Sequence, residues 1–264
     1  MQAYGRWLHA RVGRRASRKM YTGTMFLRNR PVLELMGRLA AGKPERSRMR
    51  VAVLGCSIGV EVYSIVWALR RAHPDLTFAV VGSDMSEEVL RVAEKGVYGP
   101  QSSEFVNAAV FERLTEDEAQ ELFDLDGDQA QVKPWLREGI DWRVGDASDP
   151  ELVATLGPQD IVVANNFLCH MDAQSAERCL RNFARLVAPG GYLFVAGVDL
   201  DLRTRVAVEL GWIPVEELMA EIHEGDPSVR GDFWPWEWWA LEPLDRRRRD
   251  WQTRYASVFQ IGSN

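Results

Sequence analysis

The sequence has few cysteines and histidines and no long apolar run, which excludes several classes of protein. Its 264 residues include three cysteines and four histidines. Cys56, Cys169 and Cys179 are an odd number in no metal-ligand spacing, so we expect reduced thiols and no metal site. No stretch reaches the length of a membrane span, and no apolar segment follows the basic N-terminus as in a signal peptide. We therefore expect a cytoplasmic protein with no membrane partner.

A basic excess is also missing. The net charge is -6 at pH 7, which argues against a nonspecific nucleic-acid binder. Basic residues do concentrate in the first fifty positions and at Arg246 to Arg249. We interpret both patches as solvated faces, with contact to an acidic partner as the alternative.

Short apolar runs alternate with segments of helical periodicity between residues 49 and 196. The runs are typical of buried parallel strands and cover residues 49–55, 77–82, 160–164 and 191–196. Helices are expected at residues 61–72, 86–95 and 173–186, with Ser86 as an N-cap. This alternation predicts a Rossmann-like, doubly wound α/β fold with a mostly parallel sheet.

The two ends of the chain depart from this pattern. Residues 1–48 are expected to form a short helical N-terminal segment, with two helices broken near Pro31. Residues 49–264 form the main domain, whose C-terminal region, residues 212–264, is rich in tryptophan. Within it, residues 237–242 and 255–261 predict an antiparallel strand pair at the sheet edge.

A turn with two glycines, Gly55 to Gly59, follows the first predicted strand. Open α/β sheets bind ligands beyond the carboxyl ends of their strands, and glycine lets a ligand approach the backbone closely. Asp84 ends the second strand, where a carboxylate can accept both ribose hydroxyls. The turn lacks the third glycine that seats a pyrophosphate, which favours S-adenosylmethionine over NAD. For the glycines alone, a plain tight turn is the alternative.

The residues from Gly55 to Ser64, GCSIGVEVYS, resemble the GCSTGEEPYS motif of the CheR-type chemotaxis-receptor glutamate methyltransferases. Upstream, residues 22–28 are similar to the T-x-F-F-R segment of that family. The likeness continues, in the family's order, through residues 82–86, 95–98, 132–137, 160–172 and 188–194. The resemblance implies a class I methyltransferase that uses S-adenosylmethionine and releases S-adenosylhomocysteine.

The resemblance also implies roles for particular residues. It assigns Glu61 to the methionyl ammonium and Asp84 to the ribose. Thr22, Thr24 and Arg28 would approach the methionyl carboxylate and the reaction centre, with the N-terminal segment covering the cofactor. These roles agree with the chemistry, because a guanidinium suits a carboxylate and a carboxylate suits an ammonium.

On the same resemblance, Asp146 and Ala147 would meet the adenine, with Asp146 where the family usually has Asn. Asn165 and Asn166 fall where the family has Arg-Asn, so one cationic contact is absent. The full set of predicted cofactor-binding residues is Thr22, Thr24, Arg28, Gly55, Cys56, Gly59, Glu61, Asp84, Met85, Asp146, Ala147, Asn165 and Asn166.

Departures from the family bear on the substrate. The family carries a helical domain before its T-x-F-F-R segment, whereas only residues 1–21 precede it here. The inserted β-subdomain that some members use for docking, about residues 120–142, is kept but trimmed. The family's active-site tyrosine is replaced by His170.

His170 suggests a change of methyl acceptor. A carboxylate, with a pKa near ~4.3, is already ionised at neutral pH and needs no base. A hydroxyl or ammonium must lose a proton, which an imidazole can take. We therefore expect methyl transfer to an oxygen or nitrogen of a small-molecule acceptor, with His170 and Arg28 as the catalytic residues. The oligomeric state is left open.

Three alternatives stay open. His170 could be a residue of the pocket wall in a protein carboxylate (glutamate) O-methyltransferase. The chain could instead be a non-catalytic regulator that binds S-adenosylmethionine. The aromatic run from Phe233 to Trp239 predicts packing at the sheet edge, with an aromatic lid over the acceptor as the other interpretation. His223 would be a second candidate base on that lid.

Overall fold

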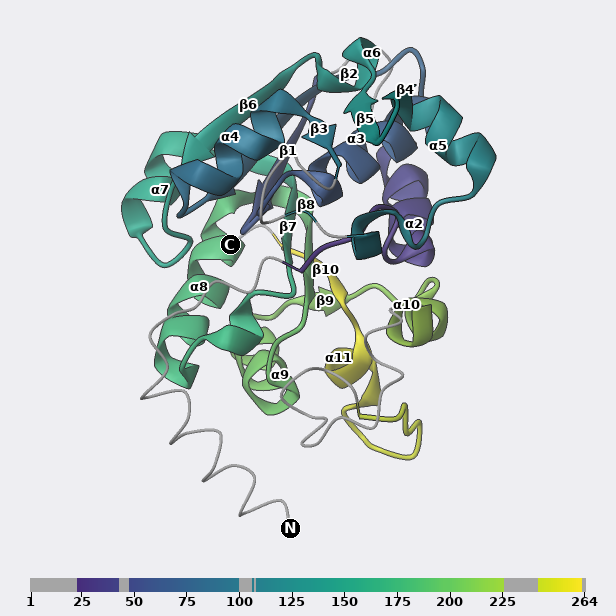
Figure 1. Ribbon diagram of the computed structural model, residues 1–264. Helices are drawn as coiled ribbons and strands as arrows, with labels where there is room; N and C mark the ends of the chain where they lie inside the picture. The colour runs from purple at the N-terminus through teal and green to yellow at the C-terminus, as the bar shows by residue number, and fades with distance from the viewer. Residues whose placement is uncertain (1–22, 43–47, 100–105, 107, 226–241, 263–264) are drawn as a thin grey trace. The chain divides into compact units, whose positions relative to one another are not determined.

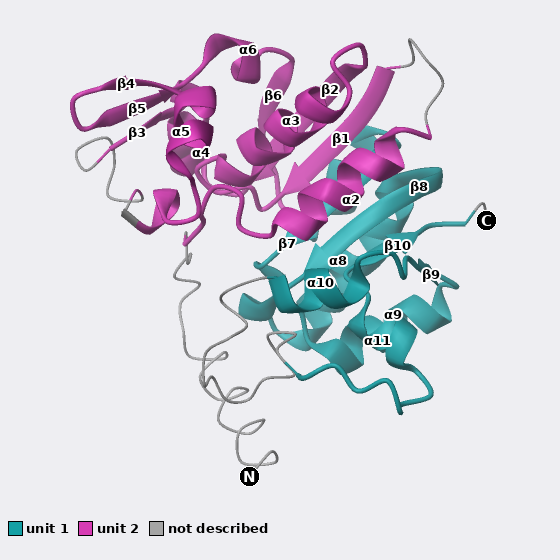
Figure 2. Ribbon diagram, turned by 90° about the vertical axis from the view of Figure 1, so that its right-hand side faces the viewer, with its two compact units in different colours: residues 1–21, 147–264 teal, residues 22–146 magenta. Residues whose placement is uncertain are grey.

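The computed structural model describes residues 23–42, 48–99, 106, 108–225 and 242–262. Figure 1 shows its helices and strands in chain order. The chain divides into two compact units, coloured separately in Figure 2. Unit 1 consists of residues 1–21 and 147–264, and unit 2 consists of residues 22–146. Both units contain strands and helices, which agrees with the predicted α/β class.

Three parallel strands form the larger sheet segment of unit 2. They are β1 (Arg48–Leu54), β2 (Thr77–Asp84) and β6 (Ile140–Val144), in the order β6-β2-β1. The last four residues of β1 are all buried, as expected for a parallel strand that is covered on both faces. The register of β1 with β2 places Leu54 beside Ser83. The two strands therefore end at the same edge.

The helices α2 (Arg30–Ala40), α3 (Val60–Ala72) and α4 (Glu87–Lys95) also belong to unit 2. The predicted N-cap of α4 is confirmed, because the Ser86 hydroxyl accepts a hydrogen bond from the Val89 N–H at 3.4 Å. Glutamates in the first turn of α4 and a lysine in its last turn match the helix dipole. α4 ends at Gly96, whose φ of +61° suits a residue without a side chain.

A small antiparallel sheet completes unit 2. Its strands are β3 (Val97–Tyr98), β4 (Phe123–Asp126) and β5 (Gln129–Val132), in the order β3-β5-β4. The short helices η1 (Ala108–Phe111), α5 (Glu116–Leu122) and α6 (Pro134–Arg137) accompany it. The rings of Phe26, Tyr98, Phe111 and Phe123 pack together, with centroids 4.9 to 6.2 Å apart. This aromatic cluster attaches the small sheet to the segment that precedes α2.

The strands of unit 1 are both parallel and antiparallel. β7 (Gln159–Asn165) pairs in parallel with β8 (Val187–Ala196). β10 (Val258–Gln260) lies antiparallel between β8 and β9 (Ile213–Pro214). The predicted combination of parallel strands with an antiparallel C-terminal pair is therefore confirmed. The long apolar runs of β7 and β8 are buried, as in a sheet with helices on both faces.

Helix α8 (Ala173–Leu186) of unit 1 forms where the sequence predicts a helix. Cys179, Leu180, Phe183 and Leu186 lie at helical spacing and are all buried. Asp172 caps the helix by accepting from the Ser175 N–H at 2.9 Å, and it also accepts from the Ser175 hydroxyl. These two hydrogen bonds hold the pKa of Asp172 below its usual value. The other helices of the unit are α7 (Pro150–Leu156), η2 (Leu168–His170), α9 (Leu200–Glu209), α10 (Met219–Gly225) and α11 (Trp251–Tyr255).

The structure bears on the prediction at both ends of the chain. Pro31 lies in the first turn of α2, where its missing N–H costs nothing. Residues 1–22, on which most of the first predicted helix falls, lie outside the described part of the chain. The predicted strand 255–261 is shorter, because α11 continues through Tyr255. The second antiparallel partner of β10 is β9, not residues 237–242. Most of that segment, like the aromatic run 233–239, lies outside the described residues.

A buried arginine anchors the C-terminal part of unit 1. Arg203 on α9 is fully buried and donates to the carbonyl oxygens of Val195 and Arg254, at 2.9 and 2.8 Å. Burial lowers the pKa of Arg203 to about 9. Arg254 in turn pairs with Asp201 and Glu242, so one polar network joins β8, α9 and α11. Within the described part of the chain, no helix combines the length and apolarity needed to cross a membrane.

Candidate active site

The turn between β1 and α3 has the backbone conformation that its glycines predict. Gly55 and Gly59 have φ values of +64° and +82°, in the left-handed region that glycine adopts without strain. The Cys56 N–H donates to the Ser83 carbonyl oxygen at 3.0 Å, which joins the turn to β2. Gly59 precedes the first turn of α3 and provides no side-chain cap. The turn therefore presents backbone N–H groups at a helix N-terminus, a favourable place for an anionic group.

Contacts with Ala93 and Trp142 explain why Gly59 cannot carry a side chain. A Cβ atom at Gly59 would lie 2.7 Å from the Ala93 Cβ and 2.8 Å from the Trp142 ring. Trp142 also covers Gly82, the residue beside it in the β2–β6 register. A Cβ atom at Gly82 would approach that ring to 2.5 Å. Trp142 thus packs directly on the backbone of the turn and of β2.

Asp84 lies at the end of β2 and is bonded to the turn. Its Oδ2 accepts from the Ser57 N–H at 2.9 Å, and its Oδ1 accepts from the Ser86 N–H at 3.0 Å. A carboxylate offers about four lone-pair positions, and these two bonds use two of them. Two hydroxyls on neighbouring carbons, as in ribose, fit the capacity that is left. The described residues therefore fit the adenosine part of S-adenosylmethionine.

The first turn of α3 carries Glu61. The side chain is half-buried at the helix N-terminus. A carboxylate here can pair with an ammonium, while the neighbouring N–H groups favour a carboxylate. A methionyl group has both charges. Cys56, in contrast, is buried, and burial raises the pKa of its thiol well above the usual value, so it is a poor nucleophile.

The segment before α2 is attached to α3. Of the residues predicted there, Thr22 lies outside the described part of the chain, and Thr24 and Arg28 are half-buried. Between them, Leu27 is buried and has a φ of +51°. Its N–H donates to the Ser64 hydroxyl at 3.1 Å. This bond holds the backbone directly before Arg28 against α3.

A buried tyrosine supports the turn from its other side. The Tyr98 hydroxyl donates to the Ile58 carbonyl oxygen at 2.6 Å. The rings of Tyr98 and Phe26 pack edge to face, with their centroids 5.3 Å apart. Sequence reasoning did not identify Ser64, Tyr98 or Trp142. For Ser64 and Tyr98, the signal was their position inside the segments that resemble the family.

Two further predicted residues of unit 2 lie at the ends of strands. Met85 follows β2, and 46% of its surface is exposed, which is unusual for a large apolar side chain. Asp146 follows β6 and is half-buried. The structure gives Met85 an open apolar surface next to Asp84, consistent with a residue that a ligand would cover.

Of the predicted residues of unit 1, Asn165 and Asn166 lie at the end of β7, whereas Ala147 bonds to α8. The Asn165 side-chain oxygen accepts from the Ala196 N–H at 3.0 Å. Asn166 has a φ of +63°, and its backbone is so close to Gly197 that a Cβ there would lie 2.7 Å from the Asn166 Cα. Ala147 is buried, and its carbonyl oxygen accepts from the Asn182 amide at 3.3 Å.

His170 is the last residue of η2, directly after this turn. Its side chain is exposed, whereas Cys169 is buried. The Cys169 N–H donates to the Gly197 carbonyl oxygen at 2.9 Å, which fixes η2 against the end of β8. The backbone next to His170 is therefore fixed by a hydrogen bond, and the His170 side chain is exposed at the surface of unit 1.

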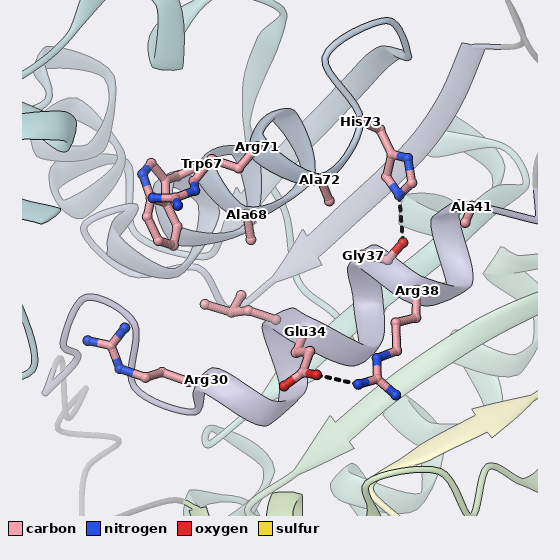
Figure 3. A pocket seen from close by; sticks show the side chains of 11 residues that line it. Arg30, Glu34, Gly37, Arg38, Ala41, Trp67, Ala68, Arg71, Ala72 and His73 are labelled. Carbon is pink, nitrogen blue, oxygen red and sulfur yellow. Dashed lines mark hydrogen bonds and ion pairs between the residues drawn. The ribbon is translucent and has the colours of Figure 1, made fainter.

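A separate surface pocket of about 640 Å³ lies between α2 and α3 (Figure 3). Arg38 pairs with Glu34, and the His73 ring meets the Gly37 carbonyl oxygen at 2.7 Å. A Cβ at Gly37 would lie 3.2 Å from the Ala72 Cβ, which is a tight contact. No predicted cofactor-binding residue lines this pocket.

The geometry describes an α/β protein in which Asp84 and the β1–α3 turn fit the ribose of a nucleoside-type ligand. Residues 23–201 match the family described as CheR methyltransferase, SAM binding domain. The chain belongs to this family, so the predicted class is confirmed: a methyltransferase whose cofactor is S-adenosylmethionine.

Several curated proteins are similar to the chain. A probable biofilm formation methyltransferase WspC from Pseudomonas aeruginosa is 27% identical over 183 residues, which are 69% of this chain and 42% of that protein. The WspC of Pseudomonas putida is 29% identical over 85% of this chain and 48% of its own length. A chemotaxis protein methyltransferase from Listeria monocytogenes is 28% identical over 58% of this chain and 55% of its own. The chain thus spans about half the length of these relatives.

Solved structures of methyltransferases are also similar, at low identity. The N-methyltransferase NodS from Bradyrhizobium japonicum is 13% identical with a TM-score of 0.42, covering 80% of this chain and 87% of that one. An O-methyltransferase family protein from Burkholderia thailandensis is 17% identical with a TM-score of 0.38, covering 64% and 38%. These values are too low to bear on the substrate.

The relatives overturn the predicted small-molecule acceptor. Their names are those of chemotaxis protein methyltransferases and of methyltransferases of biofilm formation. The acceptor predicted from His170 is wrong, because a single side chain does not determine the acceptor. An imidazole can occupy a tyrosine's place without acting as a base.

Proposed function

We propose that the protein transfers the methyl group of S-adenosylmethionine to the side-chain carboxylate of a glutamate in a protein. The observation that carries this proposal is the family match over residues 23–201. The hydrogen bond that Asp84 accepts from Ser57, in the turn between β1 and α3, supports it. The named relatives that methylate chemotaxis proteins support the choice of acceptor.

The residues of the chain would bind and orient the two substrates. S-adenosylmethionine supplies an electrophilic methyl group on a sulfonium sulfur. Asp84 would hold the ribose hydroxyls, Glu61 the methionyl ammonium, and Arg28 the methionyl carboxylate. Gly55 and Gly59 let the ligand approach the backbone. These assignments place the ammonium and the carboxylate of the ligand each opposite a side chain of opposite charge.

A glutamate carboxylate requires no base. With a pKa near ~4.3 it is ionised at neutral pH, and methylation gives a neutral ester without loss of a proton. The rate would therefore depend mainly on orientation and on exclusion of water. On this proposal, His170 contributes to the wall of the acceptor pocket or to recognition of the acceptor.

The direct test is transfer of a labelled methyl group. The protein is incubated with methyl-labelled S-adenosylmethionine and a chemoreceptor signalling domain, and the product is treated with alkali. We expect label on the acceptor that is released as methanol, because carboxylate methyl esters hydrolyse in alkali whereas N-methyl groups do not. An acceptor with its glutamates replaced by glutamine serves as the control. Alkali-stable label would contradict the proposal. Binding of S-adenosylhomocysteine without transfer would favour the non-catalytic regulator.

His170→Phe tests the role of the exposed histidine. We expect kcat at pH 7 to stay within about threefold of the parent enzyme, since ordinary pocket contacts change rates far less than a lost general base does. A fall of about a hundredfold or more would show that His170 takes a proton in the reaction, which a carboxylate acceptor does not require. His170→Gln, which keeps a polar side chain, distinguishes loss of a base from the effect of an apolar ring.

A further inference from the structure

One hydroxyl group in unit 2 connects the two segments that carry the predicted methionyl contacts. The Ser64 side chain is 3% exposed and makes two hydrogen bonds. It accepts from the Leu27 N–H at 3.1 Å and donates to the Val60 carbonyl oxygen at 2.8 Å. Leu27 directly precedes Arg28, and Val60 directly precedes Glu61. Ser64 itself is buried beneath these residues and is not among the predicted contacts.

The backbone at Leu27 is in a conformation that needs support. Its φ of +51° lies in the left-handed region, where a residue with a Cβ is strained. The side chain is 1% exposed, so the strain is held in the interior. Such conformations persist only where the surroundings fix them. Here the Ser64 hydroxyl bonds the Leu27 N–H, which would otherwise be a buried donor.

The residue before Leu27 is fixed independently. The Phe26 N–H donates to the Val110 carbonyl oxygen at 2.9 Å, and the Phe26 ring packs on Tyr98 and Phe123. After Arg28, Asn29 caps α2 by accepting from the Val32 N–H. Because Phe26 is held, relaxation of Leu27 would be passed on to Arg28. The placement of the guanidinium therefore depends on the bond that Ser64 accepts.

We propose that Ser64 is a positioning residue for the methyl-donor site. By holding Leu27 in the left-handed conformation, it sets the position of Arg28 relative to the first turn of α3. Ser64 acts through Arg28 and makes no contact with the ligand. This inference rests on the proposed function, because it takes Arg28 as the residue that binds the methionyl carboxylate.

A double-mutant cycle on binding of S-adenosylhomocysteine tests this proposal without any methyl acceptor. The dissociation constant is measured by calorimetry for the parent protein, Ser64→Ala, Arg28→Ala and the double variant. We expect Ser64→Ala to weaken binding about tenfold, the value of one lost hydrogen bond to a charged group. In the Arg28→Ala background, Ser64→Ala should change binding less than twofold, since residues that act through one contact are not additive.

Two further variants separate positioning from general stability. Thr204 on α9 also donates its hydroxyl to the carbonyl oxygen four residues before it, at 2.6 Å. Thr204→Val removes that bond in unit 1, and we expect unchanged affinity even if the thermal midpoint falls. Ser64→Thr keeps the hydroxyl and should recover most of the affinity that Ser64→Ala loses. If Ser64→Ala does not fold, Ser64→Cys, with a weaker acceptor of similar size, replaces it in the cycle.

The outcomes have distinct meanings. An equal loss of affinity in both backgrounds would show that Ser64 supports the fold generally and would overturn the positioning role. Unchanged affinity in Ser64→Ala, or in Arg28→Ala, would overturn it as well. If the parent protein binds no S-adenosylhomocysteine, the proposed function fails and this inference fails with it. If the parent protein binds S-adenosylhomocysteine but the losses of affinity from Ser64→Ala and Arg28→Ala are additive, the proposed function stands and the role of Ser64 does not.

Discussion

The Asp84 Oδ2 lies 2.9 Å from the backbone nitrogen of Ser57, so the carboxylate that ends β2 also holds the turn after β1. Asp84 thus has a task within the protein besides the contact with the ribose that we propose for it. Ser57 has a φ of +50°, and the bond from its N–H helps to hold this unfavourable conformation. A change at Asp84 should therefore affect both the turn and the affinity for the ligand.

We expect Asp84→Asn to weaken binding of S-adenosylhomocysteine by about ten- to a hundredfold, because hydrogen bonds to a charged acceptor are each worth roughly 1.5 to 3 kcal/mol. Asparagine keeps the shape but has a single acceptor oxygen, so it cannot retain the bonds to both Ser57 and Ser86. Calorimetry measures the affinity. Asp141→Asn, which removes an exposed carboxylate paired with Arg143 on β6, is the control and should leave it unchanged. Equal affinities for the parent protein and Asp84→Asn would remove Asp84 from the site.

Gly59→Ala should destabilise unit 2 more than an ordinary glycine substitution does. The positive φ costs about 1 to 2 kcal/mol, and the contacts of 2.7 and 2.8 Å with Ala93 and Trp142 add about 1 to 3 kcal/mol of overpacking. Urea unfolding measures the total. Gly211→Ala is a matched control, since Gly211 has a φ of +66° but a Cβ there would meet nothing within 4 Å. It should show the backbone cost alone, and equal losses for the two variants would show that the Trp142 contact is unimportant.

Tyr98→Phe and Tyr63→Phe form a second matched pair. Both hydroxyls donate to a carbonyl oxygen at 2.6 Å, Tyr98 to Ile58 and Tyr63 to Ala93. Each loss should lower the free energy of unfolding by about 1 to 2 kcal/mol, because a buried carbonyl loses its partner. Only the acceptor of Tyr98 belongs to the turn between β1 and α3. We therefore expect weaker S-adenosylhomocysteine binding in Tyr98→Phe alone, and the same loss of affinity in both variants would contradict this.

Much of the fold could be predicted from local patterns. β1, β2, β7 and β8 are apolar runs of strand length, and α3, α4 and α8 have apolar residues at helical spacing. The bounds of these elements agree with the prediction to within a few residues. The N-cap of α4, Ser86, lies where the sequence predicts it. The C-terminal region could not be predicted as well, because β10 has only three residues and depends on partners in β8 and β9 that are distant in sequence. Local sequence does not specify such partners.

The candidate site was predictable to a similar extent. The glycine turn and Asp84 could be found because their spacing is short and their chemistry is specific. The residues that hold the site were missed because they act through long-range bonds to backbone atoms. Leu27 is 37 residues from Ser64, and Tyr98 is 40 residues from Ile58. A bond to a carbonyl oxygen or an N–H places no demand on the partner's side chain, so it leaves no pattern in the sequence.

His223 provides a test of pH dependence in unit 1. The ring is 7% exposed and packs against Tyr255, and its Nε2 lies 2.7 Å from the Glu242 carbonyl oxygen. Burial is the main cause that lowers the pKa of His223, and the positive charge of Arg203 lowers it further. The hydrogen bond to Glu242 and the charges of Glu224 and Glu242 raise the pKa by less. The folded protein therefore holds the imidazole neutral at a pH where the unfolded chain, with a pKa near ~6.5, takes up a proton.

Because the unfolded state binds more protons in this range, the free energy of unfolding should fall as the pH drops below about 6.5. The stabilisation is complete above that value and is lost toward the lower pKa of the folded state, at up to about 1.4 kcal/mol per pH unit. Urea unfolding between pH 5 and 8 should show a steeper decline for the parent protein than for His223→Gln. His73→Gln controls for the loss of a histidine–carbonyl bond, since His73 Nε2 lies 2.7 Å from the Gly37 oxygen. Parallel pH profiles for the parent and His223→Gln would show that His223 is not the group that titrates.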